Sequence, residues 1–98
     1  MRIGWLTDIH LNFLSLQSRS TFYRRIRGER LDALLVGGDI GEANSVTQIL
    51  ADFAATVEVP LYFVLGNHDY YHGSIAAVRQ MITEQCASSA WLRFTKLP

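Results

Sequence analysis

The chain has 98 residues, of which 49% are hydrophobic and 18% are charged, and its nine Lys and Arg residues balance nine Asp and Glu residues. This length accommodates one domain at most, and the composition excludes a disordered, collagen-like or linker segment. A formal net charge of zero encodes no global attraction to nucleic acid or to anionic membranes, and the single cysteine, Cys86, excludes an internal disulfide and favours a reducing compartment such as the cytoplasm.

Four apolar runs predict strands. They are residues 3–6, 31–36, 61–65 and 91–97. The first three are nearly continuous, which is typical of strands covered on both faces. In the fourth run, Leu92 and Phe94 alternate with Arg93 and Thr95, which indicates a half-exposed strand near an edge.

Helical patterns lie between these runs. Phe22 and Ile26 anchor a first helix that we expect to end at Gly28. The second helix has an apolar stripe formed by Val46, Ile49, Leu50, Phe53, Ala54 and Val57. Ser45 and Gln48 have the spacing of a capping box at its start, and Pro60 stops it. A third helix is predicted after Ser74, with one face formed by Ile75, Val78, Ile82 and Cys86.

Strands and helices therefore alternate, which predicts a βαβαβαβ α/β fold with parallel central strands joined by right-handed crossovers. Asp39 lies 31 residues after Asp8, and Asp69 lies 30 residues after Asp39. That spacing is close to the roughly 30 residues of one βαβ unit. Neither a linker nor a domain boundary is visible, so we expect residues 1–98 to form a single domain.

Polar residues follow each of the first three strands, at residues 7–10, 37–42 and 66–69. The carboxyl ends of parallel strands lie side by side, so these three segments are expected to converge. Asp8, Asp39 and Asp69 have no Lys or Arg beside them in sequence, and unpaired carboxylates near a core destabilise a fold. A bound cation would neutralise them. Asp8 and His10 are two residues apart, so we expect them to leave one face of a strand end and chelate one ion.

Asp8-x-His10, then Gly38-Asp39, then Gly66-Asn67-His68-Asp69 resemble the first three motifs of the calcineurin-like metallophosphoesterases. The resemblance spans residues 3–69 and implies an α/β fold that is half of a four-layer α/β/β/α sandwich. The family completes its metal shell with later histidines on a second sheet, including a Gly-His-x-His segment. This sequence has no histidine after His72, so residues 1–98 resemble the N-terminal part of such a domain.

The resemblance implies a metal-dependent phosphoric ester hydrolase with two divalent ions, of Mn, Fe, Ni or Zn. By motif position, Asp8 and His10 would bind the first ion, Asp39 would bridge both, and Asn67 would bind the second. His68 would protonate the leaving oxygen or steady the transferring phosphoryl group. Asp69 would orient His68, and Asn67 and His68 would contact the substrate. Two such ions hold a bridging hydroxide for in-line attack on phosphorus.

Other interpretations remain open. A non-catalytic module would bind metal, or a partner, through an uncovered sheet face, and the mean hydropathy of +0.11 agrees with apolar surface that associates. A Rossmann-like nucleotide binder has the same topology but needs a Gly-rich turn where Asp8-Ile9-His10 stands.

Two kinds of partner are not expected. The arginines of residues 19–30 favour a solvated helix face, so we expect no nucleic-acid partner. No apolar run is long enough to predict membrane insertion.

Further residues near the motifs are less specific. His72, with Tyr70 and Tyr71, lies either in a pocket wall or in a solvated loop. Glu42 is expected to face solvent near a helix start rather than to bind a metal.

Overall fold

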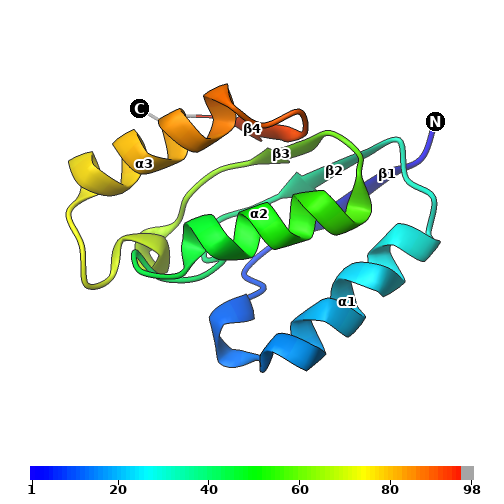
Figure 1. Cartoon of the computed structure of the whole chain (residues 1–98), viewed down its shortest axis with the longest axis horizontal. Coiled ribbons are helices and arrows are strands. Elements are labelled where there is room, and N and C mark those ends of the chain that lie inside the picture. Colours follow the sequence, from blue (N-terminus) through cyan, green and yellow to red (C-terminus); the bar gives the residue numbers. More distant parts are fainter. Residues whose placement is uncertain (96–98) are drawn as a thin grey trace.

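The chain forms one parallel sheet with a helix in each crossover. The computed structural model describes residues 1–95. The strands, in sheet order, are β1 (Ile3–Leu6), β2 (Ala33–Val36), β3 (Leu61–Phe63) and β4 (Leu92–Phe94), and all neighbouring pairs are parallel. The helices are α1 (Leu16–Gly28), α2 (Val46–Val57) and α3 (Ile75–Ala87), with short 3-10 helices η1 (Leu11–Phe13) and η2 (Asn67–Tyr70) (Figure 1). The predicted α/β fold is confirmed.

β1 has the bounds of its predicted run, residues 3–6, whereas β2 and β3 are shorter than the apolar runs that predicted them. The second begins at Ala33 instead of Leu31, and the third ends at Phe63 instead of Leu65. β4 is an edge strand whose residues alternate between buried and exposed, as the sequence predicts. The end of the last predicted strand, residues 96–97, lies outside the described residues.

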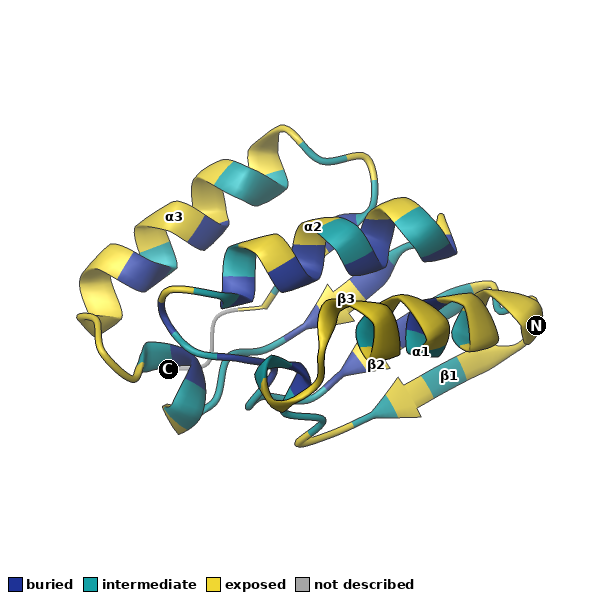
Figure 2. Cartoon of the chain, turned by 60° about the horizontal axis from the view of Figure 1, so that its bottom comes forward, coloured by how far each residue is buried: buried dark blue, intermediate teal, exposed yellow. Residues whose placement is uncertain are grey.

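All three helices lie on the same face of the sheet. Right-handed crossovers between strands taken in sequential order place successive helices on one side. Leu34, Val36 and Phe63 point into that side and are nearly fully buried. Figure 2 shows the consequence, because the helices are dark blue where they meet the sheet and yellow on their outer faces.

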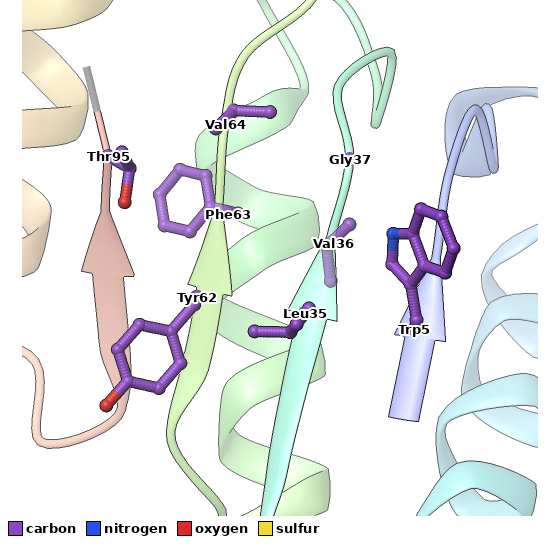
Figure 3. A pocket seen from close by; sticks show the side chains of 8 residues that line it. All are labelled: Trp5, Leu35, Val36, Gly37, Tyr62, Phe63, Val64 and Thr95. Atoms are coloured by element: carbon purple, nitrogen blue, oxygen red, sulfur yellow. The ribbon is translucent and has the colours of Figure 1, made fainter. Parts of the chain in front are cut away.

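The opposite face of the sheet is open and apolar. Trp5 is 77% exposed, and Leu35 and Tyr62 are 42% and 43% exposed. A pocket on this face includes all three side chains and extends to Thr95 (Figure 3). The expectation that the first three strands are covered on both faces is therefore wrong for the described residues of this chain, since no crossover helix reaches the second face.

The centre of the core is α2. Ile49, Leu50 and Phe53 have no exposed surface, which confirms the predicted stripe. Tyr23 of α1 stacks on Phe53, with ring centroids 4.7 Å apart and an interplanar angle of 19°. In α1, Tyr23 is the buried residue, whereas the two predicted anchors, Phe22 and Ile26, are only partly buried.

The predicted capping box at α2 is wrong. The Ser45 hydroxyl accepts a hydrogen bond from the backbone N–H of Glu42 at 3.0 Å, so it closes the preceding turn and does not cap the helix. Gln48 donates to the Asp52 carboxylate instead. The helix ends at Val57, and Glu58 follows in the left-handed conformation before Pro60 is reached.

At α3 the predicted start is confirmed, because the Ser74 hydroxyl accepts a hydrogen bond from the N–H of Ala77. Val78 and Ile82 are buried and Cys86 is partly buried. Ile75 is 57% exposed, however. The loop before α3 and the first turn of the helix together form an exposed segment, residues 71–77.

Candidate metal centre

The loops after β1 and β2 run side by side beyond the strands. The backbone N–H of Asp8 donates to the carbonyl of Gly38 at 3.2 Å, and that of His10 donates to the carbonyl of Asp39 at 2.9 Å. These bonds continue the pairing of β1 with β2 past Leu6 and Val36. The first two motifs therefore meet at the carboxyl edge of the sheet, at the left of Figure 1.

The third motif packs against the second at close range. A Cβ atom on Gly38 would lie 2.6 Å from the Cα of Gly66, so the two loop backbones touch. The N–H of His68 donates to Asp39 Oδ1 at 2.9 Å. Neither Gly38 nor Gly66 has a positive φ, so it is the close approach of the two loops that requires glycine at both positions.

Asp8, His10 and Asp39 form a compact group of possible metal ligands. One ligand atom from each lies within 4.8 Å of the other two. All three residues are in the left-handed conformation, with φ of 52°, 43° and 63°. Such a conformation costs on the order of 1–3 kcal/mol at a residue other than glycine, and it is concentrated at functional sites. Asp8 and His10 thus converge through a twisted loop and not through the pleat of a strand.

The hydrogen bonds of this group are incomplete in a way that fits a cation. The Thr7 hydroxyl donates to Asp8 Oδ2 at 2.9 Å, and Asp39 Oδ1 accepts the N–H of His68. His10 Nδ1 is buried and has no hydrogen-bond partner among residues 1–95. Two carboxylates and an imidazole are a donor set that divalent Mn, Fe, Ni or Zn accepts. The residues present therefore fit a metal ion.

Asp69 occupies a different place. Its carboxylate has no exposed surface and accepts four backbone hydrogen bonds of 2.7–2.9 Å. The donors are the N–H groups of Asp39, Ile40, Gly41 and Gly66. Burial raises the pKa of the Asp69 carboxyl above its ordinary value, and the four N–H donors oppose that rise. These N–H groups therefore compensate the charge of the Asp69 carboxylate. The cluster of three carboxylates expected from the sequence is reduced to those of Asp8 and Asp39.

The ring of His68 lies next to the candidate metal group. Its imidazole is 4.9 Å from that of His10, edge to face at 78°, and 4.5 Å from the ring of Tyr71. Within residues 1–95, the carboxylate of Asp69 makes no hydrogen bond to this imidazole, although Asp69 is the next residue. Asn67, the other residue expected to bind metal, is exposed at the first position of η2, directly after the glycine that touches Asp39.

Two aromatic residues lie beside the site: Phe13, which no sequence motif indicates, and Tyr71, for which the sequence leaves a pocket wall and a solvated loop open. Phe13 lies 5.6 Å from His10, and Tyr71 lies 4.5 Å from His68. Each follows its histidine by three residues, and each N–H donates to the carbonyl of that histidine at 3.1 Å. Side chains three residues apart are eclipsed in a 3-10 turn. That shared spacing is the sequence feature from which both contacts follow.

Glu42 and His72 flank the third motif. The Glu42 carboxylate is 25% exposed, is 3.5 Å from His72 Nε2, and accepts a hydrogen bond from Asn12. Glu42 is thus less solvated than expected. The side chain of His72 is 75% exposed, which favours a residue of a solvated loop.

Comparison with known proteins gives one match. A family model described as calcineurin-like phosphoesterase matches residues 1–97. No curated protein and no solved structure matches the chain. Among the described residues, none of the helices has the length and apolar character needed to cross a membrane.

Proposed function

The chain belongs to the calcineurin-like phosphoesterase family, and on that premise we propose that Asp8, His10 and Asp39 hold the catalytic metal of a phosphoric ester hydrolase. The observation that carries this proposal is the convergence of three left-handed residues whose ligand atoms lie within 4.8 Å of one another. Strain of this kind is retained where the surrounding structure enforces it. Here the enforcing contacts are the paired loops and the buried Asp69.

We propose two ions: Asp39 would be a ligand of both, and Asn67 would be a ligand of the second. This arrangement is supported by the position of Asp39, which hydrogen-bonds to both neighbouring loops. When bound, divalent ions lower the pKa of a coordinated water and offset the charge of the phosphate oxygens. Two aspartates contribute −2, so two divalent ions leave a net positive site that attracts a phosphoric ester.

The chain's own residues then divide the remaining work. Asp39 is held by the N–H of His68, and Asp8 is held by the Thr7 hydroxyl, so both carboxylates are oriented before a ligand arrives. The ring of His68 lies beside that of His10, and we propose that His68 gives a proton to the leaving oxygen or donates to a phosphoryl oxygen. Asp69 acts on the site through the backbone of Asp39.

We further propose that the sheet is the N-terminal half of a larger layered domain and that a second sheet packs on its open face. Trp5, Leu35 and Tyr62 support this, because side chains of this size on one flat face are suited to packing between sheets. The same face favours the second candidate function, a module that binds metal or a partner without turning over a substrate. We propose that the protein acts in the cytoplasm.

The test is hydrolysis of p-nitrophenyl phosphate and bis(p-nitrophenyl) phosphate with Mn²⁺, Ni²⁺ or Fe²⁺. Asp39→Asn should lower the metal-dependent rate at least about 100-fold, because it removes a charge from the metal ligands. Asp52→Asn, on α2 away from the site, is the matched control and should retain the rate. Equal rates for wild type and Asp39→Asn would remove Asp39 from the mechanism. Metal binding without turnover by the wild type would support the non-catalytic module.

A further inference from the structure

Tyr71 lies beside His68, the residue proposed to give a proton to the leaving oxygen. Its ring is 4.5 Å from the His68 imidazole, at an interplanar angle of 34°. The other neighbour of that imidazole is His10, one of the candidate metal ligands. The His68 imidazole is therefore in ring contact both with a candidate metal ligand and with Tyr71.

Tyr71 is both exposed and held in place. The residue is 49% exposed, so part of its ring surface is available to a ligand. Its N–H donates to the His68 carbonyl, and its own carbonyl accepts the N–H of Ala43, both at 3.1 Å. These two hydrogen bonds hold the backbone from which the ring projects.

The chemistry of the proposed function connects these two facts. Hydrolysis forms a bond from the water oxygen to phosphorus and breaks the bond from phosphorus to the leaving oxygen. The leaving oxygen takes a proton from His68, and the proton that the attacking water releases restores the imidazole through solvent. The group attached to that oxygen must then lie close to His68, and the ring of Tyr71 is a neighbour of that imidazole.

We infer that Tyr71 forms a leaving-group subsite and that it favours phosphoric esters whose leaving group is a planar aromatic ring. The inference rests on the proposed function, since it takes His68 as the proton donor. Offset or tilted stacking between two aromatic rings adds affinity beyond the apolar area that is buried. A saturated ring of the same size lacks that added affinity.

Phosphonates test the subsite without turnover. Benzylphosphonate has a CH₂ group in place of the leaving oxygen of phenyl phosphate, and cyclohexylmethylphosphonate has the same shape without the aromatic ring. Dissociation constants are measured by calorimetry with the Mn²⁺-loaded chain. Wild type should bind the benzyl compound about threefold to tenfold more tightly.

The variants separate stacking from support of His68. Tyr71→Phe retains the ring and should retain the preference, whereas Tyr71→Leu should reduce the ratio of the two dissociation constants to about one. Phe13→Leu is the matched control, because Phe13 has the same three-residue relation to His10 on the other side of the site. It should leave the ratio unchanged.

Several results would overturn the inference. An unchanged ratio in Tyr71→Leu, or equal weakening of both phosphonates, would show that Tyr71 only supports His68. Metal-dependent hydrolysis by a wild type that binds both phosphonates equally would overturn the subsite and leave the proposed function intact. A chain that neither hydrolyses esters nor binds a phosphonate would overturn the proposed function, and the inference with it.

Discussion

At the scale of single residues, the candidate site depends on backbone segments that approach each other so closely that no side chain fits between them. Gly38 and Gly66 touch, and the four N–H groups bound by Asp69 come from both of their loops. The ligand atoms of Asp8, His10 and Asp39 are brought together by the same loops. Changes at the glycines or at Asp69 should therefore disturb metal binding as well as stability.

Gly38→Ala should destabilise the protein by about 1–3 kcal/mol, the usual cost of forcing atoms into a packed site. The new Cβ atom would lie 2.6 Å from the Cα of Gly66. Urea unfolding measures the loss, and Mn²⁺ titration should show weaker binding. Gly28→Ala is the control, because nothing lies within 4 Å of its Cβ position, and it should be neutral or stabilising. Equal effects of the two changes would contradict the close-approach explanation.

Asp69→Asn should cost about 2–5 kcal/mol in the free energy of unfolding. The amide has one acceptor oxygen where the carboxylate has two, so its NH₂ group would face backbone donors in a buried site. Chemical denaturation checks the loss. Glu84→Gln, an exposed acid on α3, is the matched control and should change stability by less than about 0.5 kcal/mol. A stable Asp69→Asn chain would show that the four hydrogen bonds contribute little.

At the scale of elements, what the sequence predicts well is what its periodicity encodes. The stripe of α2 and the alternation in β4 both identify buried faces, and both are confirmed. The Ser45–Gln48 spacing fails because a hydroxyl can bond to the turn before a helix as well as to the helix itself. Ile75 fails because periodicity does not reveal how far a helix extends past the strands that it covers.

The packing of α1 on α2 should depend strongly on Phe53. Phe53→Ala removes a fully buried ring that stacks on Tyr23, and it should cost about 3–5 kcal/mol. Ile75→Ala removes a comparable apolar group from the predicted stripe of α3 at an exposed position, so it should cost less than about 0.5 kcal/mol. Thermal or urea unfolding measures both. A similar loss from the two substitutions would contradict the observed burial.

For the site residues, too, some features could be predicted from the sequence and others could not. Motif spacing predicts that Asp8, His10 and Asp39 converge, because parallel strands bring their carboxyl ends together. The left-handed conformation of these residues and the backbone partners of Asp69 could not be predicted. They depend on how three loops distant in sequence pack against one another, and no local pattern encodes that packing.

At the scale of the whole molecule, the open sheet face is the main feature that the strand patterns did not identify. Continuous apolar runs indicate that both faces avoid water, but they do not say which chain covers the second face. Within residues 1–95 the helices cover one face only, and Trp5 remains 77% exposed on the other. An apolar face of this kind promotes association.

We therefore expect this 98-residue chain to self-associate as its concentration rises. Trp5→Glu combined with Leu35→Glu should shift the mass toward the monomer, because it places charge on the open face. Leu16→Glu is the control, since Leu16 is 71% exposed at the start of α1, and it should leave association unchanged. Sedimentation equilibrium measures the masses. A wild type that stays monomeric at high concentration would count against the half-domain proposal.

The most direct test of the metal site is anomalous diffraction from crystals grown with Mn²⁺. We predict an anomalous peak bounded by the side chains of Asp8, His10 and Asp39, within coordination distance of all three, and its loss in Asp39→Asn crystals. A map with no peak at these side chains, although Mn²⁺ is present in excess, would contradict the account.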